Sequence, residues 1–367
     1  MHTTDTVRQS PGAGGWSIPR GLVVLLSIAA IIICVTGLKA FAGVVGPTFL
    51  ALMLTIAVQP IQTRVQQRGG PAWLGMLLAF GAVLLILVGF GGALALSAAQ
   101  LASRLPQYTG SLDNLLDTVR GWLDAAGLSH DQTQKALQDI DLGKLVGLLD
   151  NLLGGVVGVF SNLFFVAALL LFMAVDGMSM RPRMAVVAAE RPAIAQALGS
   201  FAAGTRKYLV VSTVFGAIVA VIDGGALWLL GVPLPLLWAL LSFITNYIPN
   251  IGFIIGVIPP ALLALLDSGP VLMVWVIVVY SAINFVIQSI IQPKFVGDAV
   301  GLSVTITFLS LVFWSWVLGG LGAILAIPLT LLVKALLLDI DPSTRWADVL
   351  IGGPLPAKRN SAADKST

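Results

Sequence analysis

Asp223 is the clearest ionisable residue inside an apolar segment of this sequence, in the stretch AVIDGGALW. A charged side chain in the hydrocarbon of a bilayer costs at least about 2.5 kcal/mol, so it normally faces protein or water. A carboxyl group there can exchange protons, bind a cation or form hydrogen bonds with a polar substrate. The alternative is a structural acid, paired inside the protein or placed at the membrane surface near its helix end.

A second group consists of polar residues at steps of three and four, namely Ser281, Asn284, Gln288 and Gln292. This spacing places them on one face of a helix. Amide groups both donate and accept hydrogen bonds, so the face suits a neutral, hydroxylated solute. The alternative is that these groups join two membrane helices by hydrogen bonds.

A third group lies in NYIPNIGFIIGVIPP, which interrupts an uncharged run from Leu234 to Leu266. Irregular backbone at membrane depth is tolerated where protein or a wet cavity surrounds it, and its freed carbonyls can bind solutes or ions. The alternative is that prolines only kink a packed helix, while the Gly-x-x-x-Gly pair admits a neighbouring helix. We expect this group to meet the amide face and, with Asp223, to form a substrate or ion pathway; its members are Asn246, Tyr247, Pro249, Asn250 and Gly252.

Membrane helices must position these residues, because 57% of the chain is hydrophobic and only 10% is charged, against about 25% charged residues in soluble domains. The sequence predicts an all-α, polytopic membrane protein with about eight membrane segments. The apolar stretches are Gly21–Val58, which holds two spans with a turn at Gly37–Lys39, then Ala72–Ala98, Leu152–Val175, Tyr208–Leu230, Leu234–Leu266, Val271–Ile291 and Leu302–Leu338.

Two of these blocks, Leu234–Leu266 and Leu302–Leu338, are too long for one span of about 20 residues. Both carry Gly and Pro near the middle, and GFIIGVIPPALLAL resembles GLGAILAIPLTLL. Each block also follows an ordinary span, which makes a weak internal repeat of the kind that marks transporter sites. Each block is either one broken span or a re-entrant hairpin. The two topologies place Gln292–Gly301 outside the cell or in the cytoplasm, respectively.

Lys and Arg residues place both termini in the cytoplasm, because cytoplasmic loops carry an excess of them. The predicted organisation is a disordered cytoplasmic tail (1–20), three membrane spans (21–98), extracytoplasmic amphipathic helices (99–151), a fourth span (152–176), a basic cytoplasmic segment (177–207), a transport core with broken segments (208–338) and a second cytoplasmic tail (339–367).

Several classes of protein are excluded by what the sequence lacks. The only histidines are His2 and His130, both outside apolar runs, so no histidine metal site forms inside the bilayer. Neither a phosphate-binding loop for ATP nor an H-E-x-x-H motif is present. An aspartyl intramembrane protease needs two acids in facing spans, and only Asp223 lies well inside one. We therefore expect no enzyme activity, no cofactor and no metal.

Three motifs carry a family resemblance: FITNYIPNIGFIIGVIPP, QPKFVGDAVGLS and WVLGGLGAILAIPLT, together with AVDG at the end of the fourth apolar run. In order and spacing they resemble the autoinducer-2 exporter (AI-2E) family of bacterial transporters, most strongly from Thr205 to Leu338. The resemblance implies eight spans, oligomeric assembly and export of the quorum-sensing signal autoinducer-2, while some similar proteins are linked to sodium–proton exchange. It supplies no shared catalytic residue.

The sequence therefore predicts an inner-membrane transporter of the autoinducer-2 exporter type that moves a small polar solute. The alternative is a cation (sodium)/proton antiporter that uses Asp223, and a membrane scaffold or signalling protein is less favoured. The expected partners are the lipid bilayer, a small polar solute or cation and further copies of the chain, but no nucleic acid.

Overall fold

The computed structural model describes residues 19–108, 163–249, 251–292 and 302–341, with a few positions between 110 and 147. Within these ranges the chain is almost entirely helical, which confirms the all-α class. The predicted amphipathic helices of 99–151 and the two predicted tails lie mostly outside the described residues, as does Asn250.

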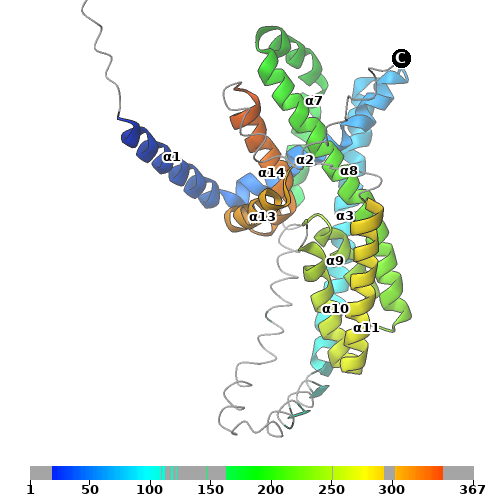
Figure 1. Ribbon diagram of the computed structural model, residues 1–367. Coiled ribbons are helices and arrows are strands. Elements are labelled where there is room, and N and C mark those ends of the chain that lie inside the picture. The colour runs from blue at the N-terminus through cyan, green and yellow to red at the C-terminus, as the bar shows by residue number, and fades with distance from the viewer. Residues whose placement is uncertain are drawn as a thin grey trace, which may run out of the picture.

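The helices form one long series, shown in Figure 1. Seven stretches of the described chain are long and apolar enough to cross a membrane, which confirms a multi-pass protein. The helices are α1 (Arg20–Ala40), α2 (Ala42–Gln67), α3 (Ala72–Arg104) with the 3-10 turn η1 (Leu105–Tyr108), α7 (Leu163–Glu190), α8 (Pro192–Leu229), α9 (Pro235–Thr245), α10 (Gly252–Ser268), α11 (Pro270–Asn284) with the π-helix η2 (Phe285–Ile291), α13 (Val304–Leu318), and α14 (Gly320–Lys334) with the π-helix η3 (Ala335–Asp339).

Two boundaries differ from the sequence-based prediction. The break between the first two helices falls at Phe41 rather than at Gly37–Lys39, because neither Gly nor Lys is enough to end an otherwise apolar helix. Helices extend through the predicted basic segment 177–207, since α7 continues to Glu190 and α8 begins at Pro192. Proline at the first position of a helix is favourable, so Pro192 starts a helix here instead of preventing one.

The first long block folds back on itself as α9 and α10. Gly231, at φ 76°, turns the chain after α8, and α9 then runs back along α8. The start and end of the block lie at the same end of the bundle, because Leu234 and Ala264 share one buried cluster with Leu101 of α3. Tyr108, just beyond α3, donates a hydrogen bond of 3.0 Å to Asp267. The block is a helical hairpin.

The second long block forms a matching hairpin, α13 and α14, with Gly319 at its turn (φ 67°). Next to the turn, Gly322 lies against the Trp314 carbonyl, and one helical turn further from Gly319 on each helix Ser310 donates to the Ala326 carbonyl at 2.9 Å, so the two helices are antiparallel. Trp314 Nε1 also donates to Thr330 at 3.0 Å. The order of elements is therefore repeated: α8 precedes one hairpin and α11 precedes the other. The packing is not repeated, because α9 packs on α8 whereas α13–α14 pack mainly against each other, α8 and α2.

In each hairpin one glycine allows the two halves to touch. A Cβ atom on Gly252 would overlap the carbonyl oxygen of Thr245, and one on Gly322 would overlap that of Trp314. The sequence suggested that Gly252 admits a neighbouring helix. The structure instead shows it against the last residue of α9, its own partner in the hairpin.

Candidate functional site

The inner face of α8 carries a line of buried polar residues. Thr205 and Asp223 are fully buried, and Tyr208 and Ser212 between them are at most 7% exposed. Asp223 lies eighteen positions after Thr205, a rise of about 27 Å along the helix, which is close to the hydrocarbon thickness of a bilayer. We call this line the α8 polar stripe. It meets α9, the turn after α9, and α11.

Asp223 occupies one end of the α8 polar stripe. Its Oδ2 accepts a hydrogen bond of 2.6 Å from the Ser242 hydroxyl of α9. Tyr280 and Asn284 of α11 lie close enough to interact with the same carboxyl group. Within the described part of the chain, however, neither Asp223 Oδ1 nor the buried Tyr280 hydroxyl has a hydrogen-bond partner. Unpaired buried polar atoms are rare, so these two atoms mark the acidic end of the candidate site.

Amide groups connect α11 with the turn of the first hairpin. Gln288 Nε2 donates to Asn284 Oδ1 at 3.0 Å and reaches Asn246 Oδ1 at 3.5 Å. Asn246 Nδ2 donates in turn to the Ser212 carbonyl of the α8 polar stripe at 3.1 Å. The amide face predicted on α11 therefore meets the predicted break, as the sequence led us to expect.

Tyr247 fixes the turn of the hairpin to α8 at two points. Its carbonyl accepts a hydrogen bond of 2.5 Å from Tyr208, and its hydroxyl is 2.7 Å from that of Thr213. Pro249 lies half-buried in the same turn, and Gly252 begins α10 directly after it. The two residues shape the turn and hold α9 against α10.

Two predicted site residues lie apart from this network. Ser281 and Gln292 are half-buried, and no hydrogen bond among the described residues joins their side chains to Asn284 or Gln288. The structure contributes Tyr280 instead. It precedes Asn284 by four residues and Gln288 by eight, so its spacing could have revealed it. Ser242 gave no such signal, because a lone serine in an apolar helix has no distinguishing pattern.

Arg206 lies at the other end of the α8 polar stripe, next to Thr205, and ties α8 to α2. Pro60 of α2 has no N–H group, which leaves the Ile56 carbonyl, four residues earlier, without its helical partner. Arg206 Nε donates to this carbonyl at 3.3 Å, and its guanidinium also donates to Gln59. One end of the α8 polar stripe is therefore marked by the cationic Arg206, and the opposite end is marked by the acidic Asp223.

Comparisons with known proteins agree with this architecture. The sequence profile described as "AI-2E family transporter" matches residues 24–341. A Haemophilus influenzae protein named "Putative transport protein" is 33% identical over 333 residues, which cover 89% of this chain and 95% of that protein. The "AI-2 transport protein TqsA" of Escherichia coli is 32% identical over 322 residues, 85% of this chain and 90% of that protein. The chain is thus a membrane transporter that belongs to the AI-2E family.

Proposed function

We propose that this transporter exports a small, neutral, hydroxylated solute of the autoinducer-2 type across the cytoplasmic membrane. The observation that carries the proposal is the chain of amides from Asn284 through Gln288 to Asn246, which runs beside the α8 polar stripe. Each amide can donate and accept, as an uncharged hydroxylated molecule requires. The similarity to a protein named for autoinducer-2 transport supports the same class of solute.

The length of the α8 polar stripe supports a path through the membrane rather than a structural contact. Polar groups that only join helices need to meet at one level, whereas this stripe and its partners occupy several levels of α8. A solute moving along it would find a polar partner within each helical turn or two. The direct test is flux in vesicles containing the purified protein, in which autoinducer-2 is compared with sodium and with protons.

Replacing Gln288 with Leu should reduce solute flux by about tenfold, because it removes the central amide and leaves Asn246 and Asn284 oxygens without their donor. Leucine has a similar size, so the packing of η2 should be kept. The measurement is the initial rate of autoinducer-2 uptake into inverted vesicles, normalised to the amount of protein. Ser289→Leu is the matched control, since Ser289 is exposed on the same π-helix. Equal rates in the two variants would show that the amide chain does not take part in solute transport.

A second candidate function is exchange of a cation, such as sodium, for protons at Asp223. The observation that favours it is the pair of unpaired oxygens on Asp223 and Tyr280, both fully or almost fully buried. A carboxylate and a hydroxyl suit a monovalent cation or a proton better than a neutral sugar-like molecule. The effect of Asp223→Asn, described in the Discussion, separates the two functions.

We propose further that both termini are cytoplasmic, which places the open end of the α9–α10 hairpin outside the cell and that of the α13–α14 hairpin in the cytoplasm. Arg64 and Arg68 at the end of α2 and Arg206 in α8 support this orientation through the bias of basic residues to the cytoplasm.

This topology predicts where the segment between the hairpins lies. A cysteine at Lys294, a position outside the described residues, should react with a membrane-impermeant thiol reagent only from the cytoplasm. The background is Cys34→Ala, which removes the chain's one native thiol. Labelling in intact cells is compared with labelling in inverted vesicles. Reaction from outside in intact cells would overturn the two-hairpin topology in favour of eight plain spans.

A further inference from the structure

The carboxyl group of Asp223 is fully buried, and no cation within the described part of the chain forms an ion pair with it. Its neighbours are Ser242 of α9, which donates to Oδ2 at 2.6 Å, and Tyr280 and Asn284 of α11. Each of these side chains is uncharged at neutral pH. A buried carboxyl group without a cation normally binds a proton, because an isolated carboxylate is very costly in apolar surroundings.

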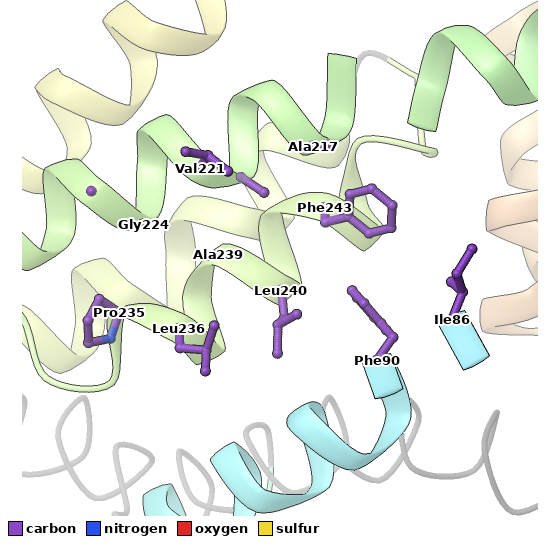
Figure 2. A pocket seen from close by; sticks show the side chains of 12 residues that line it. Ile86, Phe90, Ala217, Val221, Gly224, Pro235, Leu236, Ala239, Leu240 and Phe243 are labelled. Atoms are coloured by element: carbon purple, nitrogen blue, oxygen red, sulfur yellow. The ribbon is translucent and has the colours of Figure 1, made fainter. Parts of the chain in front are cut away.

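The face of the α8–α9 contact shown in Figure 2 brings no charge to Asp223 either. An open groove between α3, α8 and α9 is lined there by twelve residues, all of them Gly, Ala, Pro, Phe or aliphatic. Gly224, the residue after Asp223, lines the groove and packs on α9, since a Cβ atom on Gly224 would lie 2.8 Å from the Ala239 methyl carbon. No side chain of this groove carries a cation to the carboxyl group.

Tyr280 is the neighbour of Asp223 whose hydroxyl group has no partner among the described residues, and Asp223 Oδ1 has none either. An ionised carboxylate only accepts hydrogen bonds, whereas a protonated one also donates one. A proton on Oδ1 lets Asp223 donate to the Tyr280 oxygen, while Oδ2 still accepts from Ser242. One proton thus removes the buried charge and gives both unpaired oxygens a partner.

The hydrogen of the Tyr280 hydroxyl has a possible acceptor on α10. Pro260 has no N–H group, so the carbonyl of Gly256, four residues earlier, lacks its helical partner. The Tyr280 hydroxyl oxygen lies 3.7 Å from the position that a Cβ atom on Gly256 would take, which places it beside this residue. If the hydroxyl donates towards α10, its oxygen is left to accept from Asp223. The alternative, in which Tyr280 donates to an ionised Asp223, would leave the negative charge buried.

We propose that Asp223 and Tyr280 form a proton-binding pair, in which the proton lies on Asp223 Oδ1 and Tyr280 holds it in place. Tyr280 is a positioning residue, because the proton itself is bound by the carboxyl group. The pair deepens the proton-exchange function proposed above, and its role in transport rests on that function. Since the pair joins α8 to α11, loss of the proton would leave a charge between these helices and favour their separation.

Infrared spectroscopy of the full chain tests the pair directly. A protonated carboxyl group has a carbonyl band separate from the bands of carboxylates, and this band moves to lower wavenumber in D₂O. Exposed Asp and Glu side chains, with ordinary pKa values of about 4, are ionised at neutral pH. We therefore expect a D₂O-sensitive band at neutral pH in maltoside detergent, which has no carbonyl group, and loss of this band in Asp223→Asn. A spectrum without the band would show an ionised Asp223 and overturn the proposal.

Tyr280→Phe should move the band to higher wavenumber, because the acid loses its hydrogen-bond acceptor. The variant keeps the ring and removes a hydroxyl that has no other partner among the described residues, so it should fold. Tyr247→Phe is the matched control, since the Tyr247 hydroxyl contacts Thr213 instead, and the band should stay in place. An unmoved band in Tyr280→Phe would contradict the pair. The wild-type spectrum still decides whether Asp223 is protonated if this variant is unstable. Because the readout is spectroscopic, failure of the proposed transport function would leave these results unchanged.

Discussion

Asparagine in place of Asp223 should leave the protein folded in the membrane while reducing any proton-coupled cation flux by about tenfold or more. The side chain keeps its shape, and its carbonyl oxygen can still accept the hydrogen bond from Ser242. It can no longer carry a negative charge or exchange a proton, and its amide hydrogens need acceptors that the buried Tyr280 hydroxyl only partly supplies. The loss should therefore fall on transport rather than on stability.

The pH profile of this variant distinguishes the two candidate functions. If the protein exchanges cations for protons, Asp223→Asn abolishes coupled flux and removes its dependence on pH. If it exports a solute without proton coupling, solute flux survives within a few fold and keeps its original profile. Flux into vesicles is measured under imposed pH and sodium gradients with equal amounts of protein.

Asp223→Ala provides the comparison for a structural role. It removes both oxygens and leaves the Ser242 hydroxyl without an acceptor, which costs about 1 to 3 kcal/mol in a buried position. We expect it to lower the thermal unfolding midpoint as well as the flux. A wild-type rate and pH profile in the Asn variant, combined with instability of the Ala variant, would make Asp223 a structural acid and refute its role in transport.

Gly252→Ala should destabilise the protein by about 3 kcal/mol or more, at the upper end of the range for forcing an extra methyl group into a packed site. The added Cβ would overlap the backbone of Thr245, which cannot rotate away as a side chain can. The hairpin must then open at its turn, where Asn246 and Tyr247 hold it to α8. Loss of folded yield, a lower unfolding midpoint in detergent and loss of flux should appear together.

Two further substitutions calibrate this effect. Gly256→Ala should be milder, because its Cβ would lie 3.0 Å from the Thr245 hydroxyl, a side chain that can move. Gly225→Ala meets nothing within 4 Å and should be neutral or slightly stabilising. A Gly252→Ala protein that melts and transports like the Gly225→Ala protein would show that the two halves of the hairpin do not touch in the membrane.

Much of the membrane architecture could be predicted from the sequence. Hydropathy identifies the segments that are stable in a bilayer, and the basic residues indicate which loops face the cytoplasm. The Gly and Pro residues near the centres of the two long blocks located both hairpins. Hydropathy could not decide between a broken span and a hairpin, since both bury the same residues. That decision depends on tertiary packing, as in the contact of Gly252 with Thr245.

The sequence could predict those site residues that repeat at helical spacing along one helix. Asn284 and Gln288 meet Asn246 as the spacing indicated. The π-helix from Phe285 onwards was not foreseen, because no residue pattern distinguishes it from an α-helix and packing selects it. Partners such as Ser242 were missed for a similar reason. A single hydrogen bond between two helices produces no repeating pattern of residues in the sequence of either helix.

The shortness of the hairpin helices has a consequence for how the protein is made. The eleven residues of α9 rise by only about 16 Å, too little to cross the membrane as a span. The hairpin must therefore settle against helices already inserted, and the order of the chain provides them. α8 leaves the ribosome before α9, and α2 and α8 both precede α13–α14, so these helices meet docking partners as soon as they are synthesised. α10 packs mainly on α11, which follows it directly in the chain. Assembly can thus proceed in the order of translation.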